Sequence, residues 1–424
     1  MSKSASGDRD LKKKLVILFD EYPFEPGEYS FVRSELKKLL ECFDVHIISV
    51  SPSTEQKMPL DERITLHHCM REFGIKEKFK ALIGFLCSSY GVGECMKILK
   101  SGQDVAGRFY DAVVYYAMAG QMRSYVKRNR LITGGELVYS YWFNADCLAF
   151  LMEKKRYPNL RVISRIHGYD LYDERNPHNR QPFREYMDKT VDRLFFVADA
   201  GMEYYLSHWG KREMVGKKYI AAPIGTADSG SAQKNWFRGR REPFHVVSCS
   251  HVIPLKRVPL IIEGLARIKD IRIRWTHFGT GSHYEETVKY AEKLLGDKEN
   301  ISYEMTGFVP VEEIMRFYGE NCIDCFLTTS STEGSPVSVQ EAMSFGIPVI
   351  ATAVGELPNM IDGSGILLPE NPQAQDVSGA LTRFYHMSDE ETVKMHVNAR
   401  VLWEQKYNAD ENAEKFVRML KEIN

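Results

Sequence analysis

One stretch of the chain, DCFLTTSSTEGSPVSVQEAMSFGIPVIATAVGELP over residues 324–358, restricts the fold more than any other. Apolar runs at 325–327 and 349–351 are typical of buried parallel strands. Between them, Ser335 is expected to cap a helix that begins at Pro336, and Gly346 is expected to end it. A glycine-containing loop that enters a helix presents free N–H groups and the positive end of the helix dipole. The pattern therefore predicts a strand–loop–helix–strand unit with a site for an anion such as a phosphate.

Two glutamates accompany the predicted anion site. Glu333 lies in the loop, and Glu341 lies on the same face of the helix as Val337. A carboxylate next to an anion is unfavourable unless it accepts hydrogen bonds from hydroxyls of the same ligand. Sugar and ribose hydroxyls meet that requirement. The alternative is a buried structural unit whose glutamates are only solvated.

The segment TEGSPVSVQEAMSFGIPVIATAVGELP resembles the nucleotide-sugar site of the family 4 retaining glycosyltransferases, which have the GT-B fold. The resemblance implies an α/β chain with two Rossmann-like domains that face each other across a cleft. It implies that Glu333 faces the donor sugar and that Glu341 binds the ribose hydroxyls. Four residues would bind sugar hydroxyls and phosphates through their backbone: Gly334, Ser335, Pro336 and Val337. The chain departs from the family pattern at Gly355-Glu356, where relatives usually have Gly-Gly.

Other residues of the second half extend the resemblance. Lys256 and Arg257 stand where a loop enters a helix, a position suited to binding a leaving diphosphate; solvated surface cations are the alternative. Relatives have an arginine about five residues before this lysine, whereas this chain has His251. The resemblance places one further loop beside the phosphates and another near the base: Gly279, Gly281 and Phe308.

The first half opens with a strand–helix–strand pattern, since apolar runs at 15–19 and 45–50 flank an amphipathic stretch. Ligands bind beyond the carboxyl ends of such strands, which is where the Gly27 loop lies. In relatives the corresponding loop reaches toward the acceptor and the donor phosphates. Further strands are predicted at 111–116, 137–141 and 161–166. His167 follows the last of these, and the resemblance places it beside the donor sugar, although a single histidine is more often structural.

Residues 74–100 differ in character, because lysines flank an apolar group at 81–87. Such a segment can lie on an anionic membrane surface. The alternative is a pair of helices that pack on the core and expose their lysines. The membrane interpretation has functional interest because many relatives glycosylate lipid-linked acceptors.

Composition excludes several classes of protein. The chain has 424 residues, 56 of them basic and 57 acidic, so its net charge of −1 does not indicate nucleic acid as a partner. Eight scattered cysteines indicate reduced thiols rather than a disulfide framework, and the apolar run after the N-terminal lysines is too short for a signal segment. We therefore expect a cytoplasmic protein, with peripheral contact at the inner membrane face as a further expectation.

We expect four segments in the chain: an N-terminal Rossmann-like acceptor domain at 1–228, a linker at 229–243, a C-terminal Rossmann-like nucleotide-sugar domain at 244–400, and a helix at 401–424 that returns to the first domain. The predicted activity is that of a retaining hexosyltransferase that uses a UDP- or GDP-linked donor and a glycan or lipid-linked acceptor, as in surface polysaccharide synthesis. The resemblance implies front-face transfer, with Glu333, His167 and Lys256 around the reacting sugar. No cofactor and no metal are expected, since the Asp-x-Asp pair occurs only at Asp8 and Asp10.

Three alternatives remain open. A nucleotide-sugar epimerase on the same fold would need a second acid/base carboxylate deep in the first domain, and the sequence shows no obvious one. A nicotinamide-dependent dehydrogenase would need Gly-x-Gly-x-x-Gly at the opening loop, which instead reads Glu25-Pro-Gly27-Glu28. A non-catalytic sugar-binding or membrane-docking protein would not need both glutamates.

Overall fold

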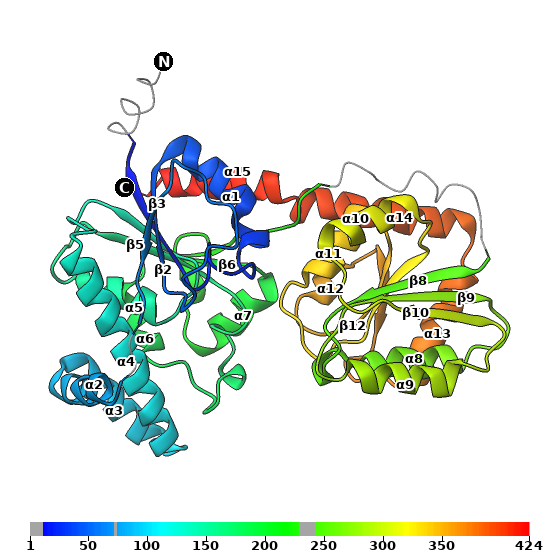
Figure 1. Ribbon diagram of the computed structural model, residues 1–424, viewed down its shortest axis with the longest axis horizontal. Coiled ribbons are helices and arrows are strands. Elements are labelled where there is room, and N and C mark those ends of the chain that lie inside the picture. Colours follow the sequence, from blue (N-terminus) through cyan, green and yellow to red (C-terminus); the bar gives the residue numbers. More distant parts are fainter. Residues whose placement is uncertain (1–11, 72–73, 229–241, 424) are drawn as a thin grey trace. The chain divides into compact units, whose positions relative to one another are not determined.

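The computed structural model describes residues 12–71, 74–228 and 242–423. Its contacts divide the chain into two compact units. The first unit runs to Ala222 and also takes in the chain from Ala413 onward, whereas the second unit is Pro223–Asn412. Each unit is built on its own sheet of parallel strands flanked by helices (Figure 1).

The sheet of the first unit has seven strands in the order β3-β2-β1-β4-β5-β6-β7. β1 pairs with β2 on one side and with β4 on the other, so the direction of strand addition reverses between β1 and β4. β1 is buried from Leu15 to Phe19, as expected for a parallel strand covered on both faces. The strands are β1 (Lys14–Phe19), β2 (Asp44–Ser49), β3 (Thr65–His68), β4 (Leu137–Ser140), β5 (Arg161–Ile166), β6 (Arg193–Phe196) and β7 (Tyr219–Ala221).

One face of this sheet packs against helices that share a single apolar core with Val16 and Leu18 of β1. The helices α2 and α3 pack on α4, and they form a hairpin at one end of the unit (Figure 1). The helices of the first unit before its C-terminal segment are α1 (Tyr29–Cys42), α2 (Ile75–Cys87), α3 (Ser89–Ser101), α4 (Val105–Arg128), α5 (Ala145–Glu153), α6 (Arg184–Thr190) and α7 (Asp199–His208).

The last helix, α15 (Ala409–Lys421), packs on the same sheet through Phe416. The ring centroid of Phe416 lies 5.1 Å from that of Tyr139 and 5.0 Å from that of Phe195. It also lies 4.4 Å from the guanidinium carbon of Arg165. Arg165 is fully buried, and its Nη1 atom is 2.7 Å from Oε1 of Glu35 in α1. The C-terminal helix therefore covers a buried ion pair of the first unit.

The sheet of the second unit has six strands in the order β10-β9-β8-β11-β12-β13. β8 pairs with both β9 and β11, so the direction of strand addition reverses between β8 and β11. All the strand pairs are parallel. The strands are β8 (Phe244–Cys249), β9 (Ile273–Phe278), β10 (Ile301–Met305), β11 (Cys325–Thr328), β12 (Val349–Thr352) and β13 (Gly365–Leu368).

Helices cover both faces of this second sheet (Figure 1), and a separate apolar core lies on each face. Neighbouring residues of one strand divide between them, since Val246 joins one core and Val247 the other. The first core is covered by α8 (Val258–Ala266), α9 (Tyr284–Leu295) and α13 (Ala374–Tyr385). The second is covered by α10 (Val311–Glu320), α11 (Val337–Ser344), α12 (Leu357–Met360) and α14 (Asp389–Lys406).

Two expectations about single elements were wrong. Residues 111–116 lie inside the helix α4 instead of forming a strand. Ala112, Ala119, Met122 and Val126 are buried at helical spacing, so the long helix overrides the β-propensity of the local Val-Val-Tyr-Tyr run. The helix α11 begins at Val337 with Pro336 as its N-cap residue, one position later than expected.

The expected linker at 229–243 lies mostly outside the described residues. Just before it, Thr226 and Asp228 contact α14: Nε1 of Trp403 donates to Oγ1 of Thr226 at 2.8 Å, and Arg400 pairs with Asp228 at 2.9 Å. In the described part of the chain, no single helix is long and apolar enough to cross a membrane. α2 and α3 pass that test only as a pair, which is bent by 83°.

Candidate functional site

In both sheets the strand order reverses next to the first strand, which is the arrangement of doubly wound α/β folds. In such folds ligands bind beyond the carboxyl ends of the two strands at the reversal. The relevant loops leave β8 and β11 in the second unit, and β1 and β4 in the first. The residues on these loops are the candidates for binding and chemistry.

In the second unit, an ion pair joins the loops that follow β8 and β11. Nζ of Lys256, in the 3₁₀ turn Pro254–Lys256, donates to Oε1 of Glu333 at 2.5 Å. The side chain of Glu333 is 9% exposed and that of Lys256 is 24% exposed. The ammonium group therefore compensates a largely buried carboxylate. The structure brings together two residues that the sequence assigned to different parts of a ligand.

Arg257, the neighbouring cation, forms hydrogen bonds to backbone carbonyls of the protein. Its Nε atom donates to the carbonyl of Thr329 at 2.6 Å, and its Nη2 atom donates to the carbonyls of Ser330 and Glu370 at 2.8 and 3.3 Å. Burial lowers the pKa of this guanidinium. Arg257 thus fixes the loop after β11, and these contacts occupy much of its donor capacity.

The helix α11 follows the Glu333 loop and presents the expected N-terminal residues. Gly334, Ser335 and Val337 are half-buried there, and Ser335 Oγ accepts a hydrogen bond from Nε2 of Gln340 at 2.8 Å. Glu341 lies one turn further along the helix. Burial, and after it the charge of Glu341, raises the pKa of the Cys249 thiol at the end of β8 to about 12. Glu341 therefore lies close to the carboxyl end of β8.

The loops after β9 and β10 close against the loop after β8. Gly279 has a φ of +134°, and a Cβ atom there would lie 1.9 Å from the carbonyl oxygen of Ser250. A Cβ atom at Gly281 would lie 2.5 Å from the carbonyl oxygen of Val252. Both glycines are thus required for close packing of backbone. His251, in the loop after β8, is exposed.

Phe308, after β10, is 78% exposed. The amide of Gly279 donates to the carbonyl of Gly307 at 2.8 Å, so the loop that carries Phe308 is tied to the loop after β9. A large ring left this open is available to stack on a ligand.

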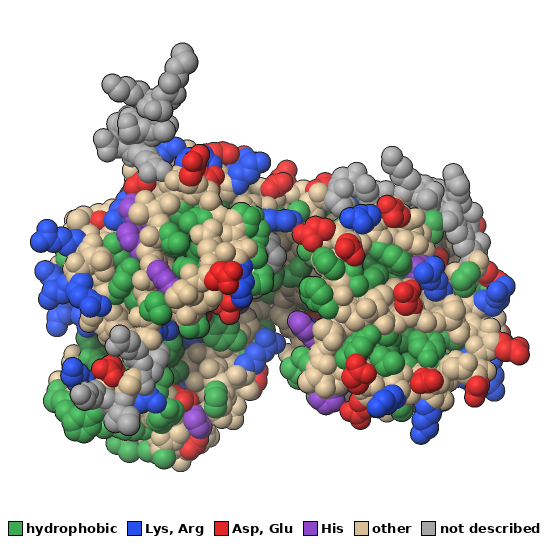
Figure 2. Space-filling model, in the orientation of Figure 1, with side chains coloured by type: hydrophobic (Ala, Val, Ile, Leu, Met, Phe, Trp, Pro, Cys, Tyr) green, Lys and Arg blue, Asp and Glu red, His purple; other side chains and the backbone are tan. Residues whose placement is uncertain are grey.

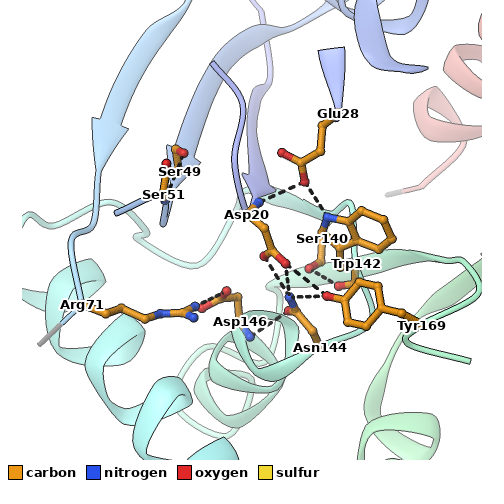
Figure 3. A network of polar contacts seen from close by, with 10 residues as sticks. All are labelled: Asp20, Glu28, Ser49, Ser51, Arg71, Ser140, Trp142, Asn144, Asp146 and Tyr169. Atoms are coloured by element: carbon orange, nitrogen blue, oxygen red, sulfur yellow. Dashed lines mark hydrogen bonds and ion pairs between the residues drawn. The ribbon is translucent and has the colours of Figure 1, made fainter. Parts of the chain in front are cut away.

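In the first unit, the loops after β1, β4 and β5 carry a network of polar contacts (Figure 3). Nδ2 of Asn144 donates to Oδ1 of Asp20 at 3.0 Å, and the hydroxyl of Tyr169 donates to Oδ2 of Asp20 at 3.1 Å. Glu28 accepts from the amides of the β1 loop, including that of Asp20 at 3.1 Å, and from Nε1 of Trp142. A carboxylate, an amide, a hydroxyl and aromatic rings together are the groups that bind sugar hydroxyls and sugar faces.

Burial and the charges around this network change the pKa of Asp20. Burial, followed by the charges of Asp146 and Glu28, raises the pKa of Asp20 to about 7, although Arg71 acts in the opposite direction. Arg71 forms a buried ion pair with Asp146 (Figure 3). Asp20 therefore exchanges its proton near neutral pH, as groups that act as acids or bases often do.

His167, which the sequence singled out, lies beside this network. Its Nε2 atom is 3.1 Å from the carbonyl oxygen of Tyr141, so the hydrogen lies on Nε2. Burial, with Arg165 nearby, lowers the pKa of His167 to about 3 and keeps the ring neutral. Its ring centroid is 4.4 Å from that of Trp142. Asp170 accepts from the amides of His167 and Phe143, both at 2.7 Å, and so ties the loops after β4 and β5 together.

The sequence indicated the Gly27 loop but not the residues that meet beside it: Asp20, Trp142, Asn144 and Tyr169. Gly27 itself is exposed, whereas Glu28 is buried and accepts from three backbone amides of its own loop. One signal was available, since Asp20 directly follows the predicted first strand. No acid/base carboxylate was obvious in the sequence of the first domain, whereas the structure places Asp20, with its raised pKa, on the loop after β1.

Comparison with known proteins places the chain among glycosyltransferases. Residues 233–402 match the family model described as glycosyl transferases group 1. The amylovoran biosynthesis glycosyltransferase AmsK of Erwinia amylovora is 30% identical over 297 residues, which cover 67% of this chain and 69% of AmsK. A protein of Escherichia coli K12 named as a colanic acid biosynthesis glycosyltransferase, WcaL, is 28% identical over 261 residues. That alignment covers 58% of this chain and 61% of WcaL.

Solved structures agree at the level of the fold. The lipopolysaccharide outer core galactosyltransferase WaaB, in its apo form, has a TM-score of 0.68 at 15% identity, covering 96% of this chain and 99% of WaaB. Anabaena HepE in complex with UDP and glucose has a TM-score of 0.63 at 14% identity, covering 97% of this chain and 100% of HepE. The expected fold class is confirmed: the chain has the two parallel-sheet α/β domains of GT-B glycosyltransferases. Within that class it belongs to the family of group 1 glycosyl transferases.

Proposed function

We propose that the protein is a family 4 retaining glycosyltransferase that transfers a hexose from a UDP- or GDP-linked donor to a glycan or lipid-linked acceptor in surface polysaccharide synthesis. The observation that carries the proposal is the Lys256–Glu333 ion pair, on the two loops at the strand reversal of the second sheet. The names of AmsK and WcaL support a role in polysaccharide synthesis. The UDP and glucose held by HepE support a nucleotide-sugar donor.

In the proposed reaction most contacts to the donor come from the second unit. Glu333 accepts hydrogen bonds from the sugar, Glu341 accepts them from the ribose, and Lys256 exchanges part of its contact with Glu333 for the diphosphate. Backbone N–H groups at the start of α11 add to the positive electrostatic potential at the diphosphate. The remaining proposed donor contacts are Gly27, His251, Arg257, Gly279, Gly281, Phe308, Gly334, Ser335, Pro336 and Val337.

The chemical step that we propose is front-face transfer. The bond between the anomeric carbon and the phosphate oxygen breaks, and the acceptor oxygen forms its bond to the anomeric carbon on the same face. The departing phosphate oxygen takes the proton of the acceptor hydroxyl. His167, neutral because its pKa is about 3, contacts the donor sugar through a hydrogen bond instead of a charge. Asp20 and Asn144 bind hydroxyls of the acceptor.

Asp20 also supports a second candidate function. A nucleotide-sugar epimerase needs an acid/base carboxylate in the first unit, and the raised pKa of Asp20, about 7, suits that role. The two functions differ in what they release. An epimerase converts the donor without freeing the nucleoside diphosphate and needs no acceptor, whereas a transferase releases the diphosphate as the sugar leaves.

A donor screen tests the proposal directly. UDP- and GDP-linked hexoses are each incubated with the full-length protein and a lipid-linked or glycan acceptor, and the released nucleoside diphosphate is measured. We expect release with one donor class and the same rate in the presence of a chelator, because Lys256 and α11 supply the positive charge at the diphosphate. Loss of activity in chelator with recovery in magnesium or manganese would contradict the metal-independent mechanism. A sugar epimer formed without nucleotide release would identify the epimerase.

A second experiment should distinguish the roles of the two glutamates. Glu333→Gln should reduce turnover strongly and leave the affinity for the nucleoside diphosphate largely unchanged, because its proposed partner is the sugar. Glu341→Ala should weaken nucleotide binding by about 1.5–3 kcal/mol for each charge-assisted hydrogen bond lost. Isothermal titration with the nucleoside diphosphate measures the affinities of the two variants, and the released nucleoside diphosphate measures their turnover. Equal losses of affinity in the two variants would show that the assignment of sugar and ribose is mistaken.

We further propose that the protein acts in the cytoplasm, where nucleotide-activated sugars are the donors. A lipid-linked acceptor would require contact with the inner face of a membrane.

A further inference from the structure

The hairpin of α2 and α3 exposes an unusual share of the apolar side chains of the chain. Of the 17 large hydrophobic residues that are exposed in the described structure, nine lie between residues 70 and 110, and six of these nine lie on α2 and α3. Figure 2 shows hydrophobic side chains gathered over this end of the first unit. Isolated exposed hydrophobic residues are ordinary, whereas a group confined to one structural element indicates a binding surface.

The exposed residues follow a helical pattern in both helices. In α2 they are Phe79, Ile83 and Leu86, which are 62%, 49% and 49% exposed. In α3 they are Val92, Met96 and Leu99, at 46%, 62% and 66%. Both sets have the spacing i, i+4, i+7, which places the three side chains of each helix on one stripe. Each helix therefore carries a continuous apolar stripe that faces solvent.

The opposite faces of the two helices are firmly packed. Phe85 is fully buried and makes edge-to-face contacts with Phe109, Tyr116 and Phe183. Glu94 is buried and forms an ion pair with Arg180. Because the inward faces are fixed in this way, the outward stripes belong to the folded hairpin and do not result from fraying.

Positive charge borders the α2 stripe. Lys78 and Lys80 are both exposed and are the two neighbours of Phe79 in sequence. Since successive residues of a helix are about 100° apart, the two lysines lie on opposite sides of the stripe. Lys100 is exposed next to Leu99 in α3. A second copy of this surface would bring lysines against lysines, whereas an anionic lipid surface would pair with them.

We propose that the α2–α3 hairpin, defined as Ile75–Ser101, lies on an anionic membrane surface with its two apolar stripes inserted between the lipid headgroups. Each helix has 13 residues, which corresponds to about 20 Å, whereas the hydrocarbon core is about 30 Å thick. The dimensions and the lysine borders therefore fit a helix pair that lies in the interface. Docking of this kind concerns lipid binding alone and does not require the reaction proposed above.

Vesicle sedimentation tests the proposal with the full-length protein. We expect the protein to sediment with vesicles of phosphatidylcholine mixed with phosphatidylglycerol, and to remain in solution with phosphatidylcholine alone. Lys78→Gln combined with Lys80→Gln should weaken binding by roughly tenfold or more, because each lysine near an anionic surface contributes about a fivefold factor. Lys289→Gln with Lys293→Gln, two exposed lysines of α9, is the matched control and should bind like the wild type.

The apolar stripes are tested in the same assay. Phe79→Ser with Ile83→Ser, and separately Met96→Ser with Leu99→Ser, should each weaken binding by roughly tenfold. The control is Val397→Ser with Val401→Ser, which are both 39% exposed on α14. All these positions are exposed, so circular dichroism should show unchanged folding. Equal binding to neutral vesicles, or no binding, would overturn the proposal. A dimer in sedimentation velocity that the stripe variants abolish would instead show that this surface joins two copies of the chain.

Discussion

Glu333 and Asp20 are carboxylates at the strand reversals of the two sheets, the first buried and the second half-buried, and their surroundings differ. Glu333 has the ammonium group of Lys256 at 2.5 Å. Asp20 accepts hydrogen bonds from the neutral groups of Asn144 and Tyr169, and other carboxylates lie nearby. Glu333 is thus compensated by a cation, whereas the pKa of Asp20 rises to about 7. Removal of Lys256 alone would leave a buried charge without compensation, which is among the most destabilising single changes.

The raised pKa of Asp20 predicts a pH-dependent contribution to stability. Its pKa is about 7 in the folded protein and about 3.9 in an unfolded chain. The folded state therefore binds this proton more tightly, and the contribution of Asp20 to the free energy of unfolding falls as pH rises from about 4 to about 7. Asp20→Asn should remove this contribution, so the Tm of the variant minus that of the wild type should increase over this range.

Thermal unfolding across this pH range provides the measurement, and Asp199→Asn, an exposed aspartate in the first turn of α7, is the matched control. A Tm difference for Asp20→Asn that does not change with pH would contradict the raised pKa.

Part of the candidate site in the second unit could be proposed from the sequence, because it lies within one contiguous, family-like stretch. Glu333, Gly334 and Glu341 are close together along the chain, so a local pattern identifies them. The network around Asp20 could not be predicted in this way. Its partners Asn144 and Tyr169 lie more than a hundred residues away in sequence and meet Asp20 only after the sheet has formed.

At the scale of elements, backbone packing around the Glu333 loop is as restrictive as the side chains are. Gly355 follows β12 with a φ of +55°, and a Cβ atom there would lie 1.8 Å from the carbonyl oxygen of Glu333. The amide of Glu356 donates to the carbonyl of Gly334 at 3.3 Å. The backbone of the loop after β12 thus packs closely against the loop after β11. The position of Glu333 therefore depends on a glycine at 355.

Gly355→Ala should therefore displace Glu333 and destabilise the second unit by about 2 kcal/mol or more, since the added methyl group meets both a steric clash and an unfavourable φ. Donor turnover should fall with it. Gly379→Ala in α13 is the matched control, because a Cβ atom there meets no other atom within 4 Å. It should leave stability unchanged or raised by about 1 kcal/mol. Denaturant unfolding and turnover measure both, and an unperturbed Gly355→Ala variant would disprove the supporting role of this loop.

Most strands could be predicted from short apolar runs, because parallel strands covered on both faces have no polar side. The prediction failed at 111–116, where helical cooperativity over the 24 residues of α4 outweighs a local β-preference. The first turn of α11 was placed one residue too early, because Ser335 bonds to Gln340 and does not cap the helix. The first error arises from helical residues outside the short run considered, whereas the second arises from a side-chain contact within the same stretch.

At the scale of the whole molecule, the first unit is discontinuous in sequence. Its sheet is formed by residues before Ala222, yet one face of it is completed by the chain from Ala413 onward. Phe416 packs against Tyr139 and Phe195 there, above the Arg165 guanidinium. Contacts this distant in sequence form late, because a long loop has to close first.

Phe416→Ala should destabilise the first unit by about 3–5 kcal/mol, the usual cost of removing a buried phenylalanine ring. Hydrogen–deuterium exchange should become faster in peptides from β4 and β6 and remain unchanged in peptides from β9 and β10. Lys415→Ala, exposed on the same helix, is the control and should cost less than about 0.5 kcal/mol. Equal acceleration in both units would show that α15 does not stabilise the first unit specifically.

Because α15 is the last helix in the described part of the chain and packs on the first sheet, the order of synthesis affects when the first unit can be completed. A ribosome completes every strand of both sheets before it reaches Ala413, so the nascent first unit waits with Tyr139, Phe195 and the Glu35–Arg165 pair uncovered. The second unit has no such delay, because all of its segments are already synthesised. A premature stop codon at Ala413 would therefore damage the part of the protein that was translated first.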